Sequence, residues 1–201
     1  QSIGKSNEGI VLIVKNGVPG DIVDVETFSK KKNYFLANIT NYVSYSKSRV
    51  DPKCEHFGTC GGCKWQNMSY DSQTLFKEKK IRHAFKNICE TKIESIIKCK
   101  DQYYYRNKLE FSFTENRWLT NQEIKSEKKE IERRGVGFHL SGMWDKIVDI
   151  NNCLLQSDPS NKIRLSVKEF AINNDISFYN SRFKNGILRN LMIRNTSLNE
   201  F

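Results

Sequence analysis

The most informative stretch of the chain is Cys54-Glu55-His56-Phe57-Gly58-Thr59-Cys60-Gly61-Gly62-Cys63, which places three cysteines in a C-x5-C-x2-C spacing. The two glycines between Cys60 and Cys63 let the backbone fold tightly enough for both sulfurs to reach one metal centre. Thiols gathered in a glycine-rich loop have little hydrophobic core to join. The spacing therefore predicts a metal site.

A further ligand is needed, because a tetrahedral zinc ion or a four-iron, four-sulfur cluster is commonly held by four cysteines. The candidates are Cys89, Cys99, Cys153 and His56. Position favours Cys153, which follows a predicted strand ending at Ile150 in a turn from which its side chain can point at a loop. The surroundings of Cys89 and Cys99 are apolar and typical of buried thiols. Zinc sites usually have two C-x2-C pairs and this chain has one, which favours a cluster and leaves zinc as the alternative.

Composition bounds the partner and the compartment. The 201 residues include 33 Lys and Arg against 23 Asp and Glu, a formal net charge of +10 that suits a polyanionic partner. No apolar run approaches the length of a membrane span, and the N-terminal residues lack the apolar stretch of a signal peptide. We expect a cytoplasmic protein with no membrane partner, whose six cysteines stay reduced.

The N-terminal residues read as short strands over 9–14, 21–28 and 34–43. The turn signals Asn16-Gly17 and Pro19-Gly20 separate the first two strands. Several short strands in so few residues predict a small barrel of the OB type that closes on itself, with a plain β meander as the alternative.

After the cysteine loop we expect a helix over residues 70–89 with Ser69 as its N-cap. Its buried stripe would be Ile81, Ala84, Phe85 and Ile88, and lysines cover the rest of its surface. Further along the chain we expect an exposed connection over 121–134 and strands over 104–113, 135–140, 146–150 and 186–194. A second helix should follow, with Asp158 as its cap and Pro159 at its first position. Its core stripe would be Ile163, Val167, Phe170 and Ala171.

The stretch from Arg49 to Gln66, followed by Tyr70 and the lysine-bearing helix, closely resembles the RNA uracil-5-methyltransferases that act on 23S rRNA and tRNA. The resemblance extends over most of the chain, through Val18-Pro19-Gly20-Asp21, Tyr105-Arg106-Asn107-Lys108, Gly135-Val136-Gly137-Phe138-His139, the segment from Asp149 to Cys153, and Gly186-Ile187-Leu188-Arg189. It implies an α+β fold: an OB-like TRAM barrel over residues 1–48, a mixed α/β central domain with an antiparallel sheet and an iron-sulfur loop over 49–185, and the start of a methyltransferase domain over 186–201. The helix over 70–89 would pack on the catalytic domain.

The same resemblance implies the cofactors and the reaction. A 4Fe-4S cluster would be held by Cys54, Cys60, Cys63 and Cys153, with a structural role. The family transfers a methyl group from S-adenosylmethionine to C5 of a uridine in RNA, by attack of a cysteine on C6 and removal of the C5 proton by a base. We expect that machinery after residue 201, so this chain would be a monomeric RNA-recognition fragment, acting on 23S rRNA or, alternatively, tRNA. The competing hypothesis is a freestanding zinc-containing RNA-binding module of the OB type.

Basic side chains on polar faces are the candidates for contact with RNA. The first to test are Arg106 and Lys108, on the polar side of the strand expected over 104–113, followed by Lys64, Arg133, Arg134 and His139. Each could equally be a solvated surface charge.

Overall fold

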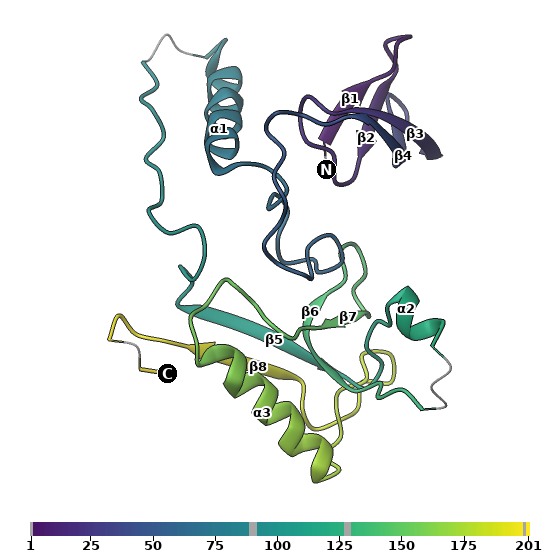
Figure 1. Cartoon of the computed structure of the whole chain (residues 1–201), viewed down its shortest axis with the longest axis vertical. Helices are drawn as coiled ribbons and strands as arrows, with labels where there is room; N and C mark the ends of the chain where they lie inside the picture. The colour runs from purple at the N-terminus through teal and green to yellow at the C-terminus, as the bar shows by residue number, and fades with distance from the viewer. Residues whose placement is uncertain (1, 89–91, 127–129, 199) are drawn as a thin grey trace. The chain divides into compact units, whose positions relative to one another are not determined.

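The computed structural model describes residues 2–88, 92–126, 130–198 and 200–201, and the chain divides into two compact units (Figure 1). Unit 1 comprises Gln1–Glu55 and Lys64–Cys99, and unit 2 comprises His56–Cys63 and Lys100–Phe201. The cysteine loop is thus divided: Cys54 belongs to unit 1, whereas Cys60 and Cys63 belong to unit 2. The domain boundaries proposed from sequence, after residues 48 and 185, stay predictions.

Unit 1 contains a four-stranded sheet in the order β1-β2-β4-β3. Its strands are β1 (Ser2–Lys5), β2 (Val11–Val14), β3 (Ile22–Lys30) and β4 (Phe35–Ser44). Strands β2 and β4 are parallel and the other pairs antiparallel, so the sheet is not a simple meander. Among the described residues, β1 and β3 form the two edges, and the closed barrel expected from sequence is not observed. Closure needs strands that can pair along their length, and β1 and β2 have only four residues each.

Asp21 fixes the turn before β3 to the segment after β4. Its carboxylate accepts hydrogen bonds from the backbone N–H of Val18 at 2.6 Å and of Ser46 at 2.9 Å, and forms an ion pair with Arg49 at 2.5 Å. Burial opposes ionisation, but these hydrogen bonds outweigh it and hold the pKa of Asp21 below its ordinary value. The Arg49 guanidinium also lies 4.8 Å from the centre of the Tyr42 ring. Arg49 therefore has a structural role in unit 1.

Helix α1 (Tyr70–Phe85) begins where the sequence predicts, and the Ser69 hydroxyl accepts the backbone N–H of Ser72. The helix ends at Phe85, earlier than predicted, and the predicted last residue, Cys89, lies outside the described residues. The predicted buried stripe is wrong: Ile81 is 48% exposed and Ile88 74% exposed. Periodicity identifies residues that share a face, but burial also needs an element packed against that face. No helix in the described part of the chain is long and apolar enough to cross a membrane.

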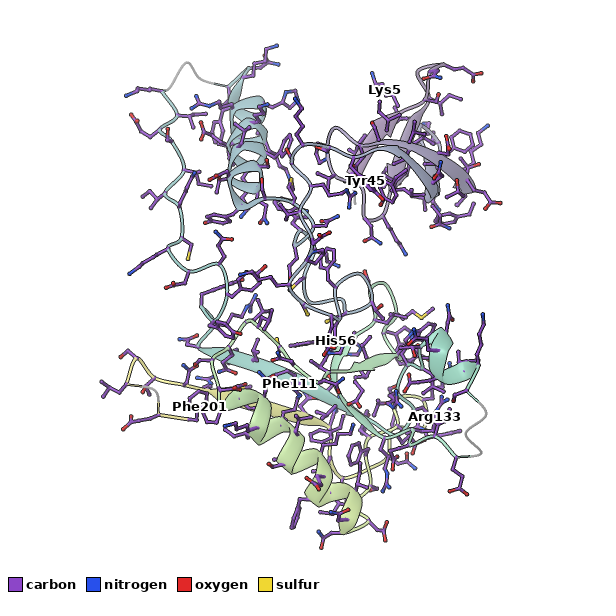
Figure 2. All side chains as sticks on the ribbon, in the orientation of Figure 1. Lys5, Tyr45, His56, Phe111, Arg133 and Phe201 are labelled. Atoms are coloured by element: carbon purple, nitrogen blue, oxygen red, sulfur yellow. The ribbon has the colours of Figure 1, made fainter. Side chains whose placement is uncertain are left out.

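Unit 2 contains a sheet in the order β7-β6-β5-β8. All of its strand pairs are antiparallel, as the sequence predicts for the central domain. Its strands are β5 (Lys108–Thr114), β6 (Gly135–His139), β7 (Ile147–Asp149) and β8 (Asn190–Arg194). Helix α3 (Ser160–Asn173) lies along one face (Figure 1). The core of this unit includes the buried side chains of Leu109, Phe111, Phe113, Val136 and Ile193; Phe111 is labelled in Figure 2.

Two predicted strands begin later than expected. Tyr104 has a φ of 56°, and the backbone N–H groups of Tyr104 and Arg106 donate to Leu154 and Leu155, so β5 starts at Lys108. Strand β8 starts at Asn190, after Gly186, which has a φ of 107°. Both positions have a left-handed backbone that a strand cannot continue through.

Helical predictions in unit 2 also need correction. The expected exposed connection contains a short helix, α2 (Asn121–Ile124), stabilised by a capping box between Thr120 and Glu123. Helix α3 starts after Pro159 with no side-chain cap, so the predicted cap by Asp158 is wrong. Within its core stripe Ala171 is buried as expected, but Phe170 is 62% exposed.

Candidate functional site

The unit 2 part of the cysteine loop is attached to the end of β6. The backbone N–H of Gly61 donates to the carbonyl oxygen of His139 at 2.8 Å. A Cβ at Gly61 would lie 2.6 Å from that same oxygen, so this close approach requires glycine. His56, labelled in Figure 2, uses its Nε2 to accept the backbone N–H of Asn151 at 3.0 Å. His56 thereby anchors the loop.

The cysteine side chains lie in different surroundings. Cys153 is buried in the core of unit 2, and Cys60 packs against the same core. The backbone N–H of Gly62 donates to the Cys60 sulfur at 3.4 Å, a contact that favours a thiolate. Cys63 is half-buried in unit 2, and the Cys54 N–H donates to Gln66 within unit 1. Among the other candidates, Cys99 is exposed and Cys89 lies outside the described residues.

A buried arginine lies beside Cys153. Arg164 is 0% exposed, and its Nη1 donates to Asn161 Oδ1, the oxygen that also accepts the Cys153 N–H. Its Nε is buried without a hydrogen-bond partner among the described residues. Burial lowers the pKa of Arg164. The cation favours negative charge nearby, and Cys153, Asp149 and Asp158 all stabilise it electrostatically.

The cysteines suit a metal centre by their chemistry, but the side chains of those that the structure describes are not arranged around an ion. No group of three or more His, Cys, Asp or Glu side chains in the described part of the chain is arranged to hold an ion. The chemistry of the donors nevertheless suits a thiolate-held centre, because Cys60 accepts an N–H and Cys153 lies near a buried cation. A cluster or zinc ion bound there would cross-link the segments that supply its ligands.

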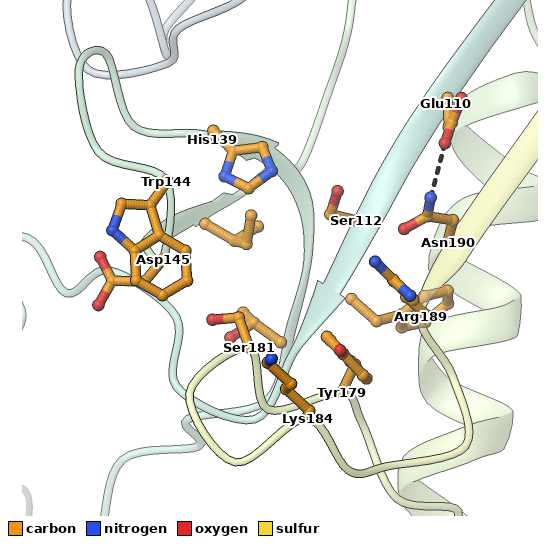
Figure 3. A pocket seen from close by; sticks show the side chains of 13 residues that line it. Glu110, Ser112, His139, Trp144, Asp145, Tyr179, Ser181, Lys184, Arg189 and Asn190 are labelled. Atoms are coloured by element: carbon orange, nitrogen blue, oxygen red, sulfur yellow. Dashed lines mark hydrogen bonds between the residues drawn. The ribbon is translucent and has the colours of Figure 1, made fainter.

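A pocket of about 620 Å³ opens on the side of the unit 2 sheet opposite the core (Figure 3). Burial alternates along β5, so Lys108, Glu110 and Ser112 share the polar face of this sheet. On β8 the register places Asn190 beside Ser112 and Arg194 beside Lys108. The remaining walls come from the segments around residues 139–147 and 179–190.

The pocket combines aromatic, basic and hydrogen-bonding groups. The Trp144 ring is 68% exposed. Arg189 lies with its guanidinium 4.8 Å from the centre of the Tyr179 ring, which orients it. The side chain of Asn190 donates from Nδ2 to Glu110 Oε1 at 2.6 Å, drawn as a dashed line in Figure 3. Such a set suits a planar, charged ligand such as a nucleotide.

The structure disperses the basic residues predicted to contact RNA. His139 lines the pocket, and Lys108 lies on the same polar face. Arg106 is exposed but precedes β5, so its predicted place on that strand is wrong. Arg134 forms an ion pair with Glu132 at 2.9 Å, whereas Arg133, labelled in Figure 2, is exposed. Lys64 is exposed in unit 1.

Sequence reasoning missed most of the pocket. Trp144, Tyr179, Lys184 and Asn190 belong to no motif, and Arg189 belongs only to the family-like segment Gly186–Arg189. These residues come from segments far apart in the chain, and sheet pairing brings them together.

Comparison with known proteins places the chain among relatives of RNA methyltransferases. It is 40% identical over its whole length to a Bacteroides thetaiotaomicron protein named uncharacterized RNA methyltransferase, and covers 44% of that protein. A Porphyromonas gingivalis protein of the same name is 36% identical, over 96% of this chain and 43% of the relative. No protein-family model matches.

The more particular likeness is to a solved structure. The Pyrococcus abyssi tRNA (uracil-54, C5)-methyltransferase, crystallised with S-adenosyl-L-homocysteine, matches 98% of this chain with a TM-score of 0.67 and 25% identity. The resemblance to RNA uracil-5-methyltransferases inferred from sequence is thus confirmed. The chain spans less than half the length of the curated relatives and of this neighbour.

Proposed function

We propose that the chain is the RNA-recognition part of an S-adenosylmethionine-dependent methyltransferase that forms 5-methyluridine in RNA, with 23S rRNA as the substrate. The observation that carries this proposal is the aromatic and basic pocket on the polar face of the unit 2 sheet, in a chain similar over its length to RNA methyltransferases. The net charge of +10 supports a polyanionic partner.

The residues of this chain would bind and orient RNA. Lys108 and Arg194 are neighbours across β5 and β8, where they can neutralise backbone phosphates. Exposed aromatic rings can stack on bases splayed from a loop, the usual mode of sequence-specific RNA recognition. S-adenosylmethionine, when bound by the whole protein, would supply the methyl group.

We also propose that Cys54, Cys60, Cys63 and Cys153 hold a 4Fe-4S cluster. The Gly62 N–H to the Cys60 sulfur and the buried Arg164 near Cys153 support negative charge at the sulfurs. The cluster would stabilise the loop that is attached to the end of β6.

RNA binding tests the main proposal. Fluorescence anisotropy should show that the chain binds a 23S rRNA hairpin more tightly than a tRNA, with an affinity that falls as salt rises. Lys108→Gln together with Arg194→Gln should weaken binding and reduce the salt slope. The matched control is Lys162→Gln with Lys125→Gln, two exposed lysines that lie outside β5 and β8. Binding without salt dependence, or equal loss in both pairs, would contradict the proposal.

Metal analysis tests the cluster separately. Anaerobically prepared protein should contain iron and sulfide in equal amounts and absorb broadly at about 400 nm. Cys153→Ser should lose most of the iron, whereas Cys99→Ser should retain it. Stoichiometric zinc in place of iron would favour the zinc module, and full iron in Cys153→Ser would refute this ligand set.

A further inference from the structure

The pocket on the polar face of unit 2 has the size and rigidity of a site for one nucleotide. Its volume of about 620 Å³ lies in the range of small-molecule sites. The segment over residues 179–190 is fixed by hydrogen bonds from Tyr179 to Leu188 and from Lys184 to Asn180, at 2.9 and 2.8 Å. A Cβ on Gly186 would lie 2.3 Å from the carbonyl oxygen of Phe178, so this turn is tightly packed. The pocket wall is therefore preorganised.

One side of the pocket offers a stacking surface and another offers positive charge. The Trp144 ring, 68% exposed, faces the pocket in Figure 3. Across the pocket, Lys184 and Arg189 come from the 179–190 segment, and the ring of Tyr179 supports Arg189. A base on Trp144 and a phosphate near Arg189 would match these two groups.

The pair Glu110 and Asn190 determines which base edge fits. A carboxylate can only accept hydrogen bonds, so the amide nitrogen of Asn190 must face Glu110, and the amide oxygen stays available. The second Glu110 oxygen is a further acceptor. The pair thus presents two oxygen acceptors and one remaining N–H of Asn190, and because the acceptors outnumber the donor, the pair favours a base edge with an exocyclic amino group. Uracil offers only one N–H, between two carbonyl oxygens that these acceptors would repel.

We propose that this pocket binds one unpaired nucleotide of the RNA whose base carries an exocyclic amino group, distinct from the uridine to be methylated. This inference rests on the proposed RNA-binding function. Glu110 and Asn190 accept the amino group of this base, Arg189 and Lys184 contact the phosphates, and Trp144, on the opposite side of the pocket, stacks on the adjacent base of the same strand.

Binding of labelled oligocytidylate and oligouridylate of equal length to the full chain tests the proposal, because the two bases have the same size. Oligocytidylate should bind about 5- to 150-fold more tightly, the discrimination expected for a well-placed hydrogen-bonded base. Trp144→Ala should weaken oligocytidylate binding about 5- to 150-fold. Phe183→Ala is the control, because Phe183 is 79% exposed on the same segment but does not line the pocket.

Glu110→Gln tests the acceptor edge itself. The new amide can still accept from Asn190, but it turns a donor toward the base, so the preference for cytosine should vanish or invert. In the unsubstituted chain, oligocytidylate should also quench tryptophan fluorescence more than oligouridylate, a readout that needs no variant. Equal binding of the two oligonucleotides, or an unchanged Trp144→Ala, would overturn the pocket assignment. If that result is found while the 23S rRNA hairpin still binds with salt dependence, only the assignment of the pocket is refuted. If no RNA binds, the proposed RNA-binding function is refuted.

Discussion

Arg164 gives the sharpest test of how unit 2 is held together. Its side chain is fully buried and donates to Asn161 Oδ1 at 2.9 Å and to the carbonyl oxygens of Ile150 and Asn151 at 2.8 and 2.9 Å. It thereby joins α3 to the segment between β7 and Cys153. Arg164→Met would remove all three hydrogen bonds: Asn161 Oδ1 would keep the Cys153 N–H, but the carbonyl oxygens of Ile150 and Asn151 would lose the guanidinium as a donor.

The expected loss follows from those contacts. At about 1 to 1.5 kcal/mol net for each of the three hydrogen bonds, Arg164→Met should lower the free energy of unfolding by about 3 to 4.5 kcal/mol. Methionine fills much of the same volume, so the cavity term is small. The variant no longer buries a charged guanidinium, and the absence of that desolvation cost partly offsets the loss of stability. That loss is a large fraction of the stability of a typical domain, about 5 to 15 kcal/mol.

Urea denaturation followed by circular dichroism measures this change. Arg182→Met is the matched control: its guanidinium pairs with Asp145 at 2.6 Å but is 66% exposed, so its loss should cost less than about 1 kcal/mol. An Arg164→Met variant as stable as wild type would refute the reasoning. It would mean that burying the cation costs as much as its hydrogen bonds contribute.

Three further predictions concern other parts of the chain. Asp21→Asn should destabilise unit 1 by about 1 to 3 kcal/mol at neutral pH, measured by urea denaturation; because the pKa of Asp21 is lowered in the folded state, the difference should shrink as the pH falls below about 4. The hydrogen bond from Arg117 lowers the pKa of Glu123 to about 2, so its stabilisation of α2 should be present above about pH 4.5 and lost toward pH 2. Glu123→Gln should abolish this pH dependence in the amide protection factors of residues 120–126, which are corrected for the intrinsic exchange rate at each pH. Gly61→Ala should speed amide exchange in residues 56–63, because its Cβ would clash with the carbonyl oxygen of His139. Gly58→Ala is the comparison: its φ of 90° strains the backbone, but its Cβ has open space and does not reach His139. Equal amide protection in wild type and Gly61→Ala would contradict the close approach of Gly61 to His139.

Local sequence signals predicted the positions of most elements. The alternation of Leu109, Phe111 and Phe113 identified a half-buried strand, and Ser69 marked the start of α1. These predictions succeeded because strand alternation and N-capping depend on neighbouring residues only. The predicted burial of Ile81 and Phe170 failed, because burial depends on which element packs against a face.

The buried stripe of α3 illustrates the same limit. It runs through Ser160, Asn161, Arg164 and Ala171, and a hydrophobic pattern cannot mark polar residues as core. Asn161 and Arg164 are buried because the carbonyl oxygens and amides they bind come from the segment after β7.

The amino-acid sequence by itself determined which proteins the chain resembles. The cysteine spacing and the family-like segments predicted a relative of RNA uracil-5-methyltransferases, because such motifs lie within short, contiguous stretches. Only the tertiary structure decided the pocket. Glu110, Trp144 and Arg189 are distant in the chain, and they line one pocket because β5 pairs with β6 and β8, a long-range hydrogen-bonding choice that no local pattern encodes.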